Sequence, residues 1–288
     1  MKQVTLDGKP FAHQTADVNG VQLHYVQGGS ATAIVLLHGY PETWYAWRKV
    51  MPALSDRYTV IAPDMRGLGE SSRPTQGYDK KTVAEDIHQL VEKLGFQQIA
   101  LVSADMGGPV AYAYAAMYPE EVSHFVILES GIPGFGLERL MDVTNGGSWH
   151  FGFFMARNFP EMLTAGRERE FLTAFAYQGS TYIKDAIVEA DIDEYLRHYA
   201  SPGGMTAGFE YYRAFPQDAQ DNQKLGKKKL TMPVLALDAE HGYGGNIATM
   251  ETVATNVQGA VVPNSGHWVA EEQPQYLVNQ ILEFLSKN

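Results

Sequence analysis

The sequence predicts an α/β protein with a mostly parallel, doubly wound sheet that carries an inserted helical segment. Short apolar segments alternate with helical ones over residues 1–130 and again over residues 231–288. This alternation is typical of parallel strands covered by helices on both faces. Between these parts, residues 131–230 are helical in pattern and rich in aromatic residues. We therefore expect a core in two parts, 1–130 and 231–288, and a helical cap, or lid, at 131–230.

The core elements can be placed in chain order from their apolar patterns. The Asn19-Gly20 pair separates two extended segments within residues 18–26 and favours a type I′ hairpin turn. Residues 80–94 have a helical apolar stripe that ends at Gly95. The other expected elements are strands at 33–37, 58–62, 99–102, 124–128, 232–237 and 260–262, and helices near 47–54, 109–117, 247–254 and 274–285.

The stretch around Asp105 has the pattern of a nucleophile elbow. A strand precedes it and a helix begins near Pro109, while the small residues Ser103 and Gly107 lie two positions before and after Asp105. Such a strained strand-to-helix turn exposes one side chain at the carboxyl edge of the sheet, where the helix N-terminus favours a negative charge. We interpret Asp105 as a nucleophile that forms an ester with its substrate. The alternative is that Asp105 caps an ordinary helix.

Three more polar side chains follow predicted strands. His38, Asp64 and Glu129 each come directly after one, as Asp105 does. Function in parallel sheets collects at the carboxyl ends of the strands. We therefore expect these four side chains at one edge of the sheet, under the cap. The aromatic residues of the cap would line an apolar pocket there, or would instead form the cap's own core.

Composition excludes several kinds of function. The 288 residues carry a formal net charge of −11, which argues against nucleic acid and anionic membrane surfaces as partners. The absence of cysteine excludes thiol catalysis, disulfides and cysteine metal sites. We expect no cofactor and no metal.

No targeting or membrane segment is evident. The first residues lack an apolar h-region, and no run of about 18 apolar residues occurs. We expect the chain as it stands to be cytoplasmic, or periplasmic or secreted if an export signal has been removed from it.

Four motifs together resemble the α/β-hydrolase superfamily over nearly the whole chain. They are the elbow at Asp105 and the segments 38–41, 64–69 and 266–268, each after a predicted strand. A serine elbow, G-x-S-x-G, occurs nowhere. The Asp nucleophile resembles the branch that contains epoxide hydrolases and haloalkane or haloacetate dehalogenases.

The resemblance implies roles for further residues. Asp105 would attack a carbon atom, and His267 would then deprotonate the water that hydrolyses the ester, a task suited to the pKa of histidine. The backbone N–H groups of Tyr40 and Met106 would form the oxyanion hole. In many relatives the acid that orients the histidine falls near Gly242, which has no side chain. The family's other location is Glu129, which we favour over Asp238 and Glu240.

The group that assists the leaving atom separates the reactions within this branch. Haloalkane dehalogenases carry Trp directly after the nucleophile, and haloacetate dehalogenases carry Arg one and four residues after it, whereas this chain has Met106 and Pro109. The Trp of the haloacetate dehalogenases' halide-binding pair falls on Phe151. These departures argue against dehalogenation.

The chain is most similar to the Cif-type bacterial epoxide hydrolases, which open the ring with a His and a Tyr of the cap. By that resemblance the pair is His150 and Tyr212, with Tyr211 as the second candidate for the tyrosine. Both His150 and Tyr212 could instead be ordinary packing residues.

The sequence therefore predicts a cofactor-independent epoxide hydrolase that converts a small apolar epoxide and water to a vicinal diol. One alternative is a dehalogenase that uses the same Asp105. Another, of a different class, is a non-catalytic protein that binds a ligand or a protein partner under the cap. A homodimer is compatible with the sequence.

Overall fold

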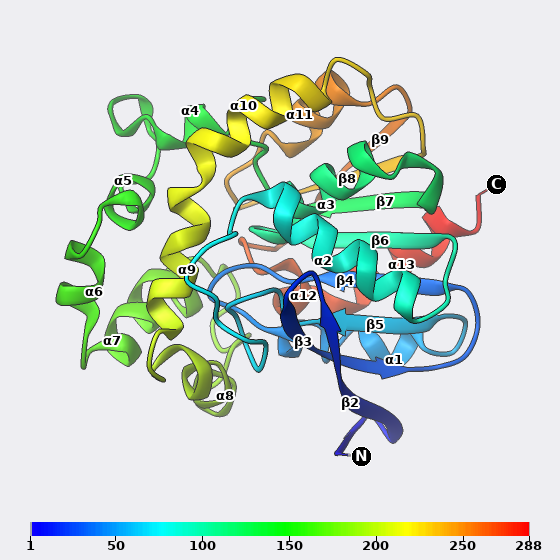
Figure 1. Ribbon diagram of the computed structural model, residues 1–288, viewed down its shortest axis with the longest axis horizontal. Coiled ribbons are helices and arrows are strands. Elements are labelled where there is room, and N and C mark those ends of the chain that lie inside the picture. Colours follow the sequence, from blue (N-terminus) through cyan, green and yellow to red (C-terminus); the bar gives the residue numbers. More distant parts are fainter. Residues whose placement is uncertain (1, 288) are drawn as a thin grey trace.

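The computed structural model describes residues 2–287. One sheet holds nine strands in the order β1-β2-β3-β5-β4-β6-β7-β8-β9 (Figure 1). Strands β4 to β9 pair in parallel, and β1, β2 and β3 pair antiparallel with their neighbours. This arrangement confirms the predicted fold class. The strands are β1 (Gln3–Leu6), β2 (Lys9–Val18), β3 (Val21–Gly28), β4 (Ala33–Leu37), β5 (Thr59–Pro63), β6 (Ile99–Ala104), β7 (Val122–Leu128), β8 (Val234–Ala239) and β9 (Val257–Val262).

Helices cover both faces of the sheet. Helices α2 (Lys80–Lys93), α3 (Gly107–Met117) and α11 (Asn246–Val253) bury one apolar cluster. Helices α1 (Met51–Leu54), α12 (Val269–Glu272) and α13 (Pro274–Leu285) bury another on the opposite face. All five residues of β4 and of β5 are buried, because helices shield both sides of these central strands.

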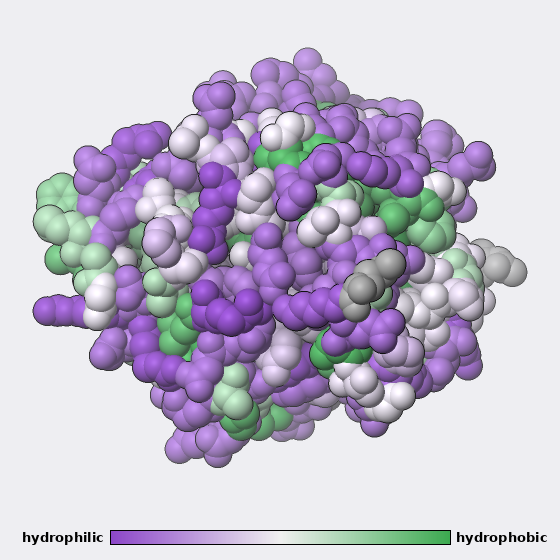
Figure 2. Space-filling view, turned by 60° about the horizontal axis from the view of Figure 1, so that its bottom comes forward, coloured by the Kyte–Doolittle hydropathy of each residue, from purple (hydrophilic) through white to green (hydrophobic). Residues whose placement is uncertain are grey.

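Seven helices lie between β7 and β8, in the segment expected to form the cap. Figure 1 shows α4 to α9 gathered at the left of the molecule, with α10 running along the top toward α11. Exposed apolar side chains occur on helix α6, where Phe159, Met162 and Leu163 are more than half exposed. Figure 2 shows a mainly hydrophilic face with hydrophobic residues at its left edge, on the side of these helices. The helices are α4 (Leu137–Met141), α5 (His150–Met155), α6 (Phe159–Thr164), α7 (Glu168–Leu172), α8 (Glu189–Tyr199), α9 (Gly204–Arg213) and α10 (Phe215–Leu225).

The predicted hairpin is present, and it is longer than expected. Strands β2 and β3 are joined by Asn19 and Gly20, whose φ angles of 41° and 75° fit the type I′ turn that this pair favours. Strand β1 and most of β2 were not expected, because their residues mix polar and apolar types without a buried run. Among residues 2–287, no helix is both long enough and apolar enough to span a membrane.

The bounds predicted for one helix are wrong. Instead of a helix over 47–54, the chain forms a short 3-10 helix at Trp44–Trp47 and a separate four-residue helix, α1. Pro52 lies in the first turn of α1. Proline lacks an N–H group and clashes with the preceding turn, so a helix can begin at Pro52 but cannot run through it.

Candidate active site

Asp105 lies in a tight turn between β6 and α3. Its φ of 45° is left-handed, which is unusual for a residue other than glycine. A Cβ atom at Gly107 would lie 2.5 Å from the carbonyl oxygen of Leu37, so the turn requires a small residue there. The side chain of Asp105 does not cap α3. It faces a pocket instead, which removes the alternative interpretation of Asp105 as a helix cap.

The Asp105 carboxylate is held in two places. Its Oδ1 accepts a hydrogen bond from the backbone N–H of Tyr40 at 2.7 Å, and its Oδ2 lies 3.2 Å from Nε2 of His267. Burial would raise the pKa of Asp105, but His267 and the backbone N–H groups of Tyr40 and Met106 outweigh it and hold the pKa below its usual range. The N–H group of Tyr40 therefore contacts the oxygen on which an oxyanion would form.

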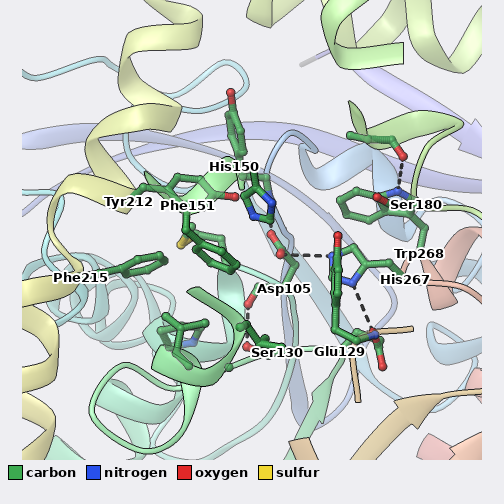
Figure 3. Close-up of a pocket in the computed structure, with 18 of the residues that line it drawn as sticks. Asp105, Glu129, Ser130, His150, Phe151, Ser180, Tyr212, Phe215, His267 and Trp268 are labelled. Atoms are coloured by element: carbon green, nitrogen blue, oxygen red, sulfur yellow. Dashed lines mark hydrogen bonds and ion pairs between the residues drawn. The ribbon is translucent and has the colours of Figure 1, made fainter. Parts of the chain in front are cut away.

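His267 bridges the two carboxylates. Its Nδ1 lies 3.4 Å from Oε2 of Glu129, on the side opposite Asp105 (Figure 3). Burial would lower the pKa of His267, but Asp105 and Glu129 raise it well above its usual value. The resting site is therefore an ion pair in which an imidazolium lies between two carboxylates.

Glu129 is fixed at the end of β7 by the backbone of the neighbouring loop. Its Oε1 accepts from the N–H of Ala239 at 2.7 Å and its Oε2 from the N–H of Tyr243 at 2.9 Å. Its φ is 41°, so the chain leaves this strand through the same unusual conformation as at Asp105. A Cβ atom at Gly242 would lie only 2.1 Å from Oε2 of Glu129. Glu129 thus fills the space that a side chain at Gly242, the usual acid position, would occupy.

The two other candidate acids have different partners. Asp238 accepts from the N–H of Asn246 at 2.9 Å, at the start of α11. Glu240 accepts from the N–H of Asn264 at 2.8 Å in an exposed turn. Of the three acidic candidates, the structure brings Glu129 to His267.

A pocket opens above Asp105. Its walls are mainly apolar and come from both the core and the cap segment, and none of its lining residues is Lys or Arg. Some aromatics of residues 131–230 face this pocket, while Phe154 packs against other aromatics of the same segment. Both expectations for these aromatics are therefore met in part. The cap side chains in the pocket wall include His150, Phe151, Phe175, Tyr212 and Phe215.

His150 and Tyr212 point into the pocket over Asp105 (Figure 3). Burial lowers the pKa of His150 to about 4, so the imidazole is neutral at pH 7. Burial, together with the nearby charge of Asp105, raises the pKa of Tyr212 well above 10 and keeps its hydroxyl protonated. Tyr211 points away from the pocket and donates to the carbonyl of Arg66 at 3.0 Å. The structure thus places Tyr212, and not Tyr211, beside His150.

The sequence did not single out two residues that bear on this site. Ser148 Oγ lies 2.6 Å from Nδ1 of His150 and fixes that ring; a serine two positions before a histidine gives no signal of its own. Glu42 is 3% exposed and accepts from the N–H of Gly39, in the turn that carries Tyr40. Burial, with Glu271 and Asp105 nearby, raises the pKa of Glu42 to about 8.

Comparisons with known proteins agree with this geometry. A profile of the alpha/beta hydrolase fold family matches residues 32–274. The soluble epoxide hydrolase of Corynebacterium sp. (strain C12) is 37% identical over 291 residues, which cover 96% of this chain and 98% of that protein. The crystal structure of wild-type Cfl2 from Burkholderia cenocepacia is 40% identical, with a TM-score of 0.89 and 95% of each chain covered. A fluoroacetate dehalogenase from Burkholderia sp. is 27% identical, covering 96% of this chain and 94% of the other.

Proposed function

This chain belongs to the alpha/beta hydrolase fold family and is a hydrolase, and we propose that it opens small apolar epoxides to vicinal diols through an ester on Asp105. The observation that carries the proposal is the position of two neutral hydrogen-bond donors, His150 and Tyr212, in the wall of the pocket that contains Asp105. An epoxide oxygen needs such donors as its ring opens, whereas a halide needs no proton. The 37% identical soluble epoxide hydrolase supports the same reaction.

In the first step, Oδ2 of Asp105 attacks an epoxide carbon and the bond from that carbon to the ring oxygen breaks. Oδ1 stays on the N–H group of Tyr40, and Oδ2, which lies beside Nε2 of His267, is the attacking oxygen. The ring oxygen becomes an alkoxide that accepts strong hydrogen bonds from Tyr212 and His150. The product of this step is an alkyl ester of Asp105.

In the second step, the ester itself turns His267 into a base. In the resting site the negative charge of Asp105 raises the pKa of His267. Esterification removes this charge. The pKa of His267 therefore falls, so the imidazolium gives its Nε2 proton to the alkoxide, which becomes the first hydroxyl of the diol. The neutral Nε2 can then accept a proton from water. The resulting hydroxide attacks Cγ of Asp105, while the N–H groups of Tyr40 and Met106 stabilise the oxyanion. The C–O bond to the substrate then breaks, and the leaving oxygen takes the proton of the new carboxyl group. The diol is released, and Asp105 is again a carboxylate beside the His267 imidazolium.

Glu129 and the cap have supporting roles in this proposal. Glu129 orients His267 through Nδ1 and is itself held by two backbone N–H groups. We assign residues 131–230 as a cap that closes the pocket to bulk water, since its helices supply most of the aromatic wall.

Dehalogenation with the same Asp105 is the second candidate, and the fluoroacetate dehalogenase relative favours it. The pocket wall opposes it. Met106 and Pro109 line the pocket at the positions where the haloacetate enzymes carry Arg. The indole N–H of Trp268 also lines the pocket, but it already donates to the carbonyl of Ala176 at 2.9 Å.

Epichlorohydrin separates the candidates, because it offers an epoxide and a carbon–chlorine bond in one small molecule. We expect diol that retains its chlorine, with Asp105→Ser as the inactive control. Chloride release with the ring intact would instead assign a dehalogenase. If neither epichlorohydrin nor a larger epoxide gave either product, the chain would instead be a non-catalytic binding protein.

The ester intermediate has its own test. With enzyme in excess over substrate in ¹⁸O-labelled water, hydroxide attacks Cγ of Asp105, so the label enters the Asp105 carboxylate. The diol from the first turnover therefore carries no label. Label in the first diol would show direct attack of water on the epoxide and contradict the ester mechanism.

A further inference from the structure

Two histidines and a glutamate come together on the outer part of the sheet, away from the pocket. His13 lies on β2 and His24 on β3, and these strands pair so that Thr15 faces His24 and His13 faces Val26. The two histidines are therefore diagonal neighbours on one face of the hairpin. Glu70 reaches them from the loop after β5. Figure 1 shows β2 and β3 near the N-terminus, apart from the cap helices at the left.

His24 is oriented as a ligand by a buried carboxylate behind it. Its Nδ1 lies 2.8 Å from Oδ2 of Asp64, which is fully buried and also accepts from the N–H groups of Trp44 and Glu70. The carboxylate of Asp64 accepts the N–H of His24, which places the proton of that ring on Nδ1. The lone pair of Nε2 then faces His13 and Glu70, in the carboxylate–histidine arrangement found behind metal ligands.

His13 supplies a second nitrogen. Its Nδ1 lies 2.9 Å from Nε2 of His24. His13 is partly buried on the same face of the hairpin as His24. Without a metal ion, a proton on Nδ1 of His13 makes the hydrogen bond to Nε2 of His24. If that proton moves to Nε2 of His13, the lone pairs of His13 Nδ1 and His24 Nε2 can both bind one ion.

Glu70 supplies an oxygen, and its two oxygens have different partners. Oε1 pairs with Lys2 at 3.2 Å and with Arg197 at 3.1 Å. Oε2 lies 3.9 Å from Nε2 of His24. The three potential ligand atoms all lie within 4.8 Å of one another. Ligand atoms about 2.0–2.2 Å from one zinc ion lie roughly 3.3–3.5 Å apart, so small side-chain movements suffice to bind it.

We propose that His13, His24 and Glu70 form a binding site for Zn²⁺ or a chemically similar divalent transition metal ion. Two imidazoles and one carboxylate suit such ions, and a single carboxylate does not suit Ca²⁺ or Mg²⁺. The site shares no residue with the pocket above Asp105. The ion would join the β2–β3 hairpin to the loop after β5 and stabilise the fold. No cysteine or sequence motif marks the site, because its three ligands come from separate segments.

Cobalt(II) titration of the tag-free protein tests the site, because tetrahedral Co²⁺ bound to histidine absorbs visible light. We expect one Co²⁺ per chain, its displacement by Zn²⁺, and a rise in Tm with Zn²⁺ that EDTA reverses. His13→Ala and Glu70→Gln should each weaken the apparent affinity at least tenfold and remove most of the Tm shift. Their Tm in EDTA, compared with that of the original chain, reports whether they fold.

Two matched variants control for non-specific effects. His88→Ala removes a histidine that lies beside two carboxylates, Glu92 and Glu121, but has no second histidine. Glu194→Gln removes another partner of Arg197. Both should bind cobalt like the original chain. The absence of a visible band and of a Tm shift, or unchanged affinity in both His13→Ala and Glu70→Gln, would overturn the proposal.

Discussion

Asp105 and Glu129 show how the backbone at the end of a strand sets the direction of one side chain. Both follow parallel strands that are neighbours in the sheet, and both have positive φ, 45° and 41°. Such conformations cost about 1–3 kcal/mol in residues other than glycine and persist where the surroundings impose them. Here each turn directs a carboxylate toward one of the two nitrogens of His267.

A glutamine in place of Glu129 tests its role. Glu129→Gln keeps the shape but removes the charge that stabilises the orientation of His267, so ester hydrolysis should slow by about 10²–10⁴-fold. Formation of the ester should change much less, because Asp105 performs it. Rapid-quench mass spectrometry of Asp105 should therefore detect accumulated ester. Asp238→Asn, which alters a carboxylate that contacts the start of α11, should hydrolyse the ester normally; the reverse pattern would move the role to Asp238.

Ser148 is predicted to be a positioning residue. Its Oγ lies 2.6 Å from Nδ1 of His150. We expect the hydroxyl to donate to this nitrogen, which would place the imidazole proton on Nε2. Ser148→Ala should slow ester formation about tenfold in single-turnover experiments, with little change in ester hydrolysis. Ser148→Thr should restore the rate, since it keeps the hydroxyl. Thr144→Ala, in the same loop, serves as the control; an equal loss there would indicate a general disturbance of the loop.

Among the elements, helix α10 of the proposed cap is tied to helix α2 by a buried ion pair. Lys80 at the start of α2 contacts Asp218 of α10 at 2.8 Å and the carbonyl of Tyr211 at 2.7 Å, and both charged side chains are about 1% exposed. Removing one member of a buried pair leaves the other without its partner. The position of α10 against α2 therefore depends on this contact.

We expect Lys80→Met to lower the free energy of unfolding by about 3 kcal/mol. Lys224→Met breaks a pair with Asp221 in the same helix, in which the lysine side chain is 68% exposed. That change should cost less than about 0.5 kcal/mol. Urea unfolding of both variants measures the difference, and equal losses would contradict a special role for the buried pair.

Elements with a strong local pattern could be predicted from the sequence, and those defined by tertiary contacts could not. The strand at 33–37 and the helix at 274–285 have the predicted bounds because each has a continuous apolar run or stripe. The helix expected over 47–54 is divided, and β1 depends on pairing with β2. In the site, the motifs identified Asp105 and His267. The close approach of Gly242 to Glu129 and the contact of Ser148 with His150 depend on spatial neighbours that no spacing reveals.

At the scale of the whole molecule, stability is coupled to pH through buried groups near the site. Glu42 has a pKa of about 8 in the folded chain against about 4.5 when unfolded. Between these values the unfolded chain loses the proton that the folded chain keeps. Folding then takes up a proton, and this carboxyl makes the free energy of unfolding fall as pH rises. His150, with its pKa lowered to about 4, has the opposite effect. The unfolded chain binds a proton at this residue more readily, so the free energy of unfolding decreases as the pH falls below about 6.5.

Glu42→Gln should therefore stabilise the protein increasingly as the pH rises from 5 to 8. Glutamine resembles the protonated carboxyl and cannot titrate, so the difference in free energy of unfolding between variant and original chain should grow by up to about 1.4 kcal/mol per pH unit. Urea unfolding at pH 5, 6.5 and 8 measures it. Glu251→Gln, at an exposed position on α11, should give a curve parallel to that of the original chain. A parallel curve for Glu42→Gln as well would mean that Glu42 is ionised in the folded state. The turn carrying Tyr40 would then hold a second negative charge behind Asp105.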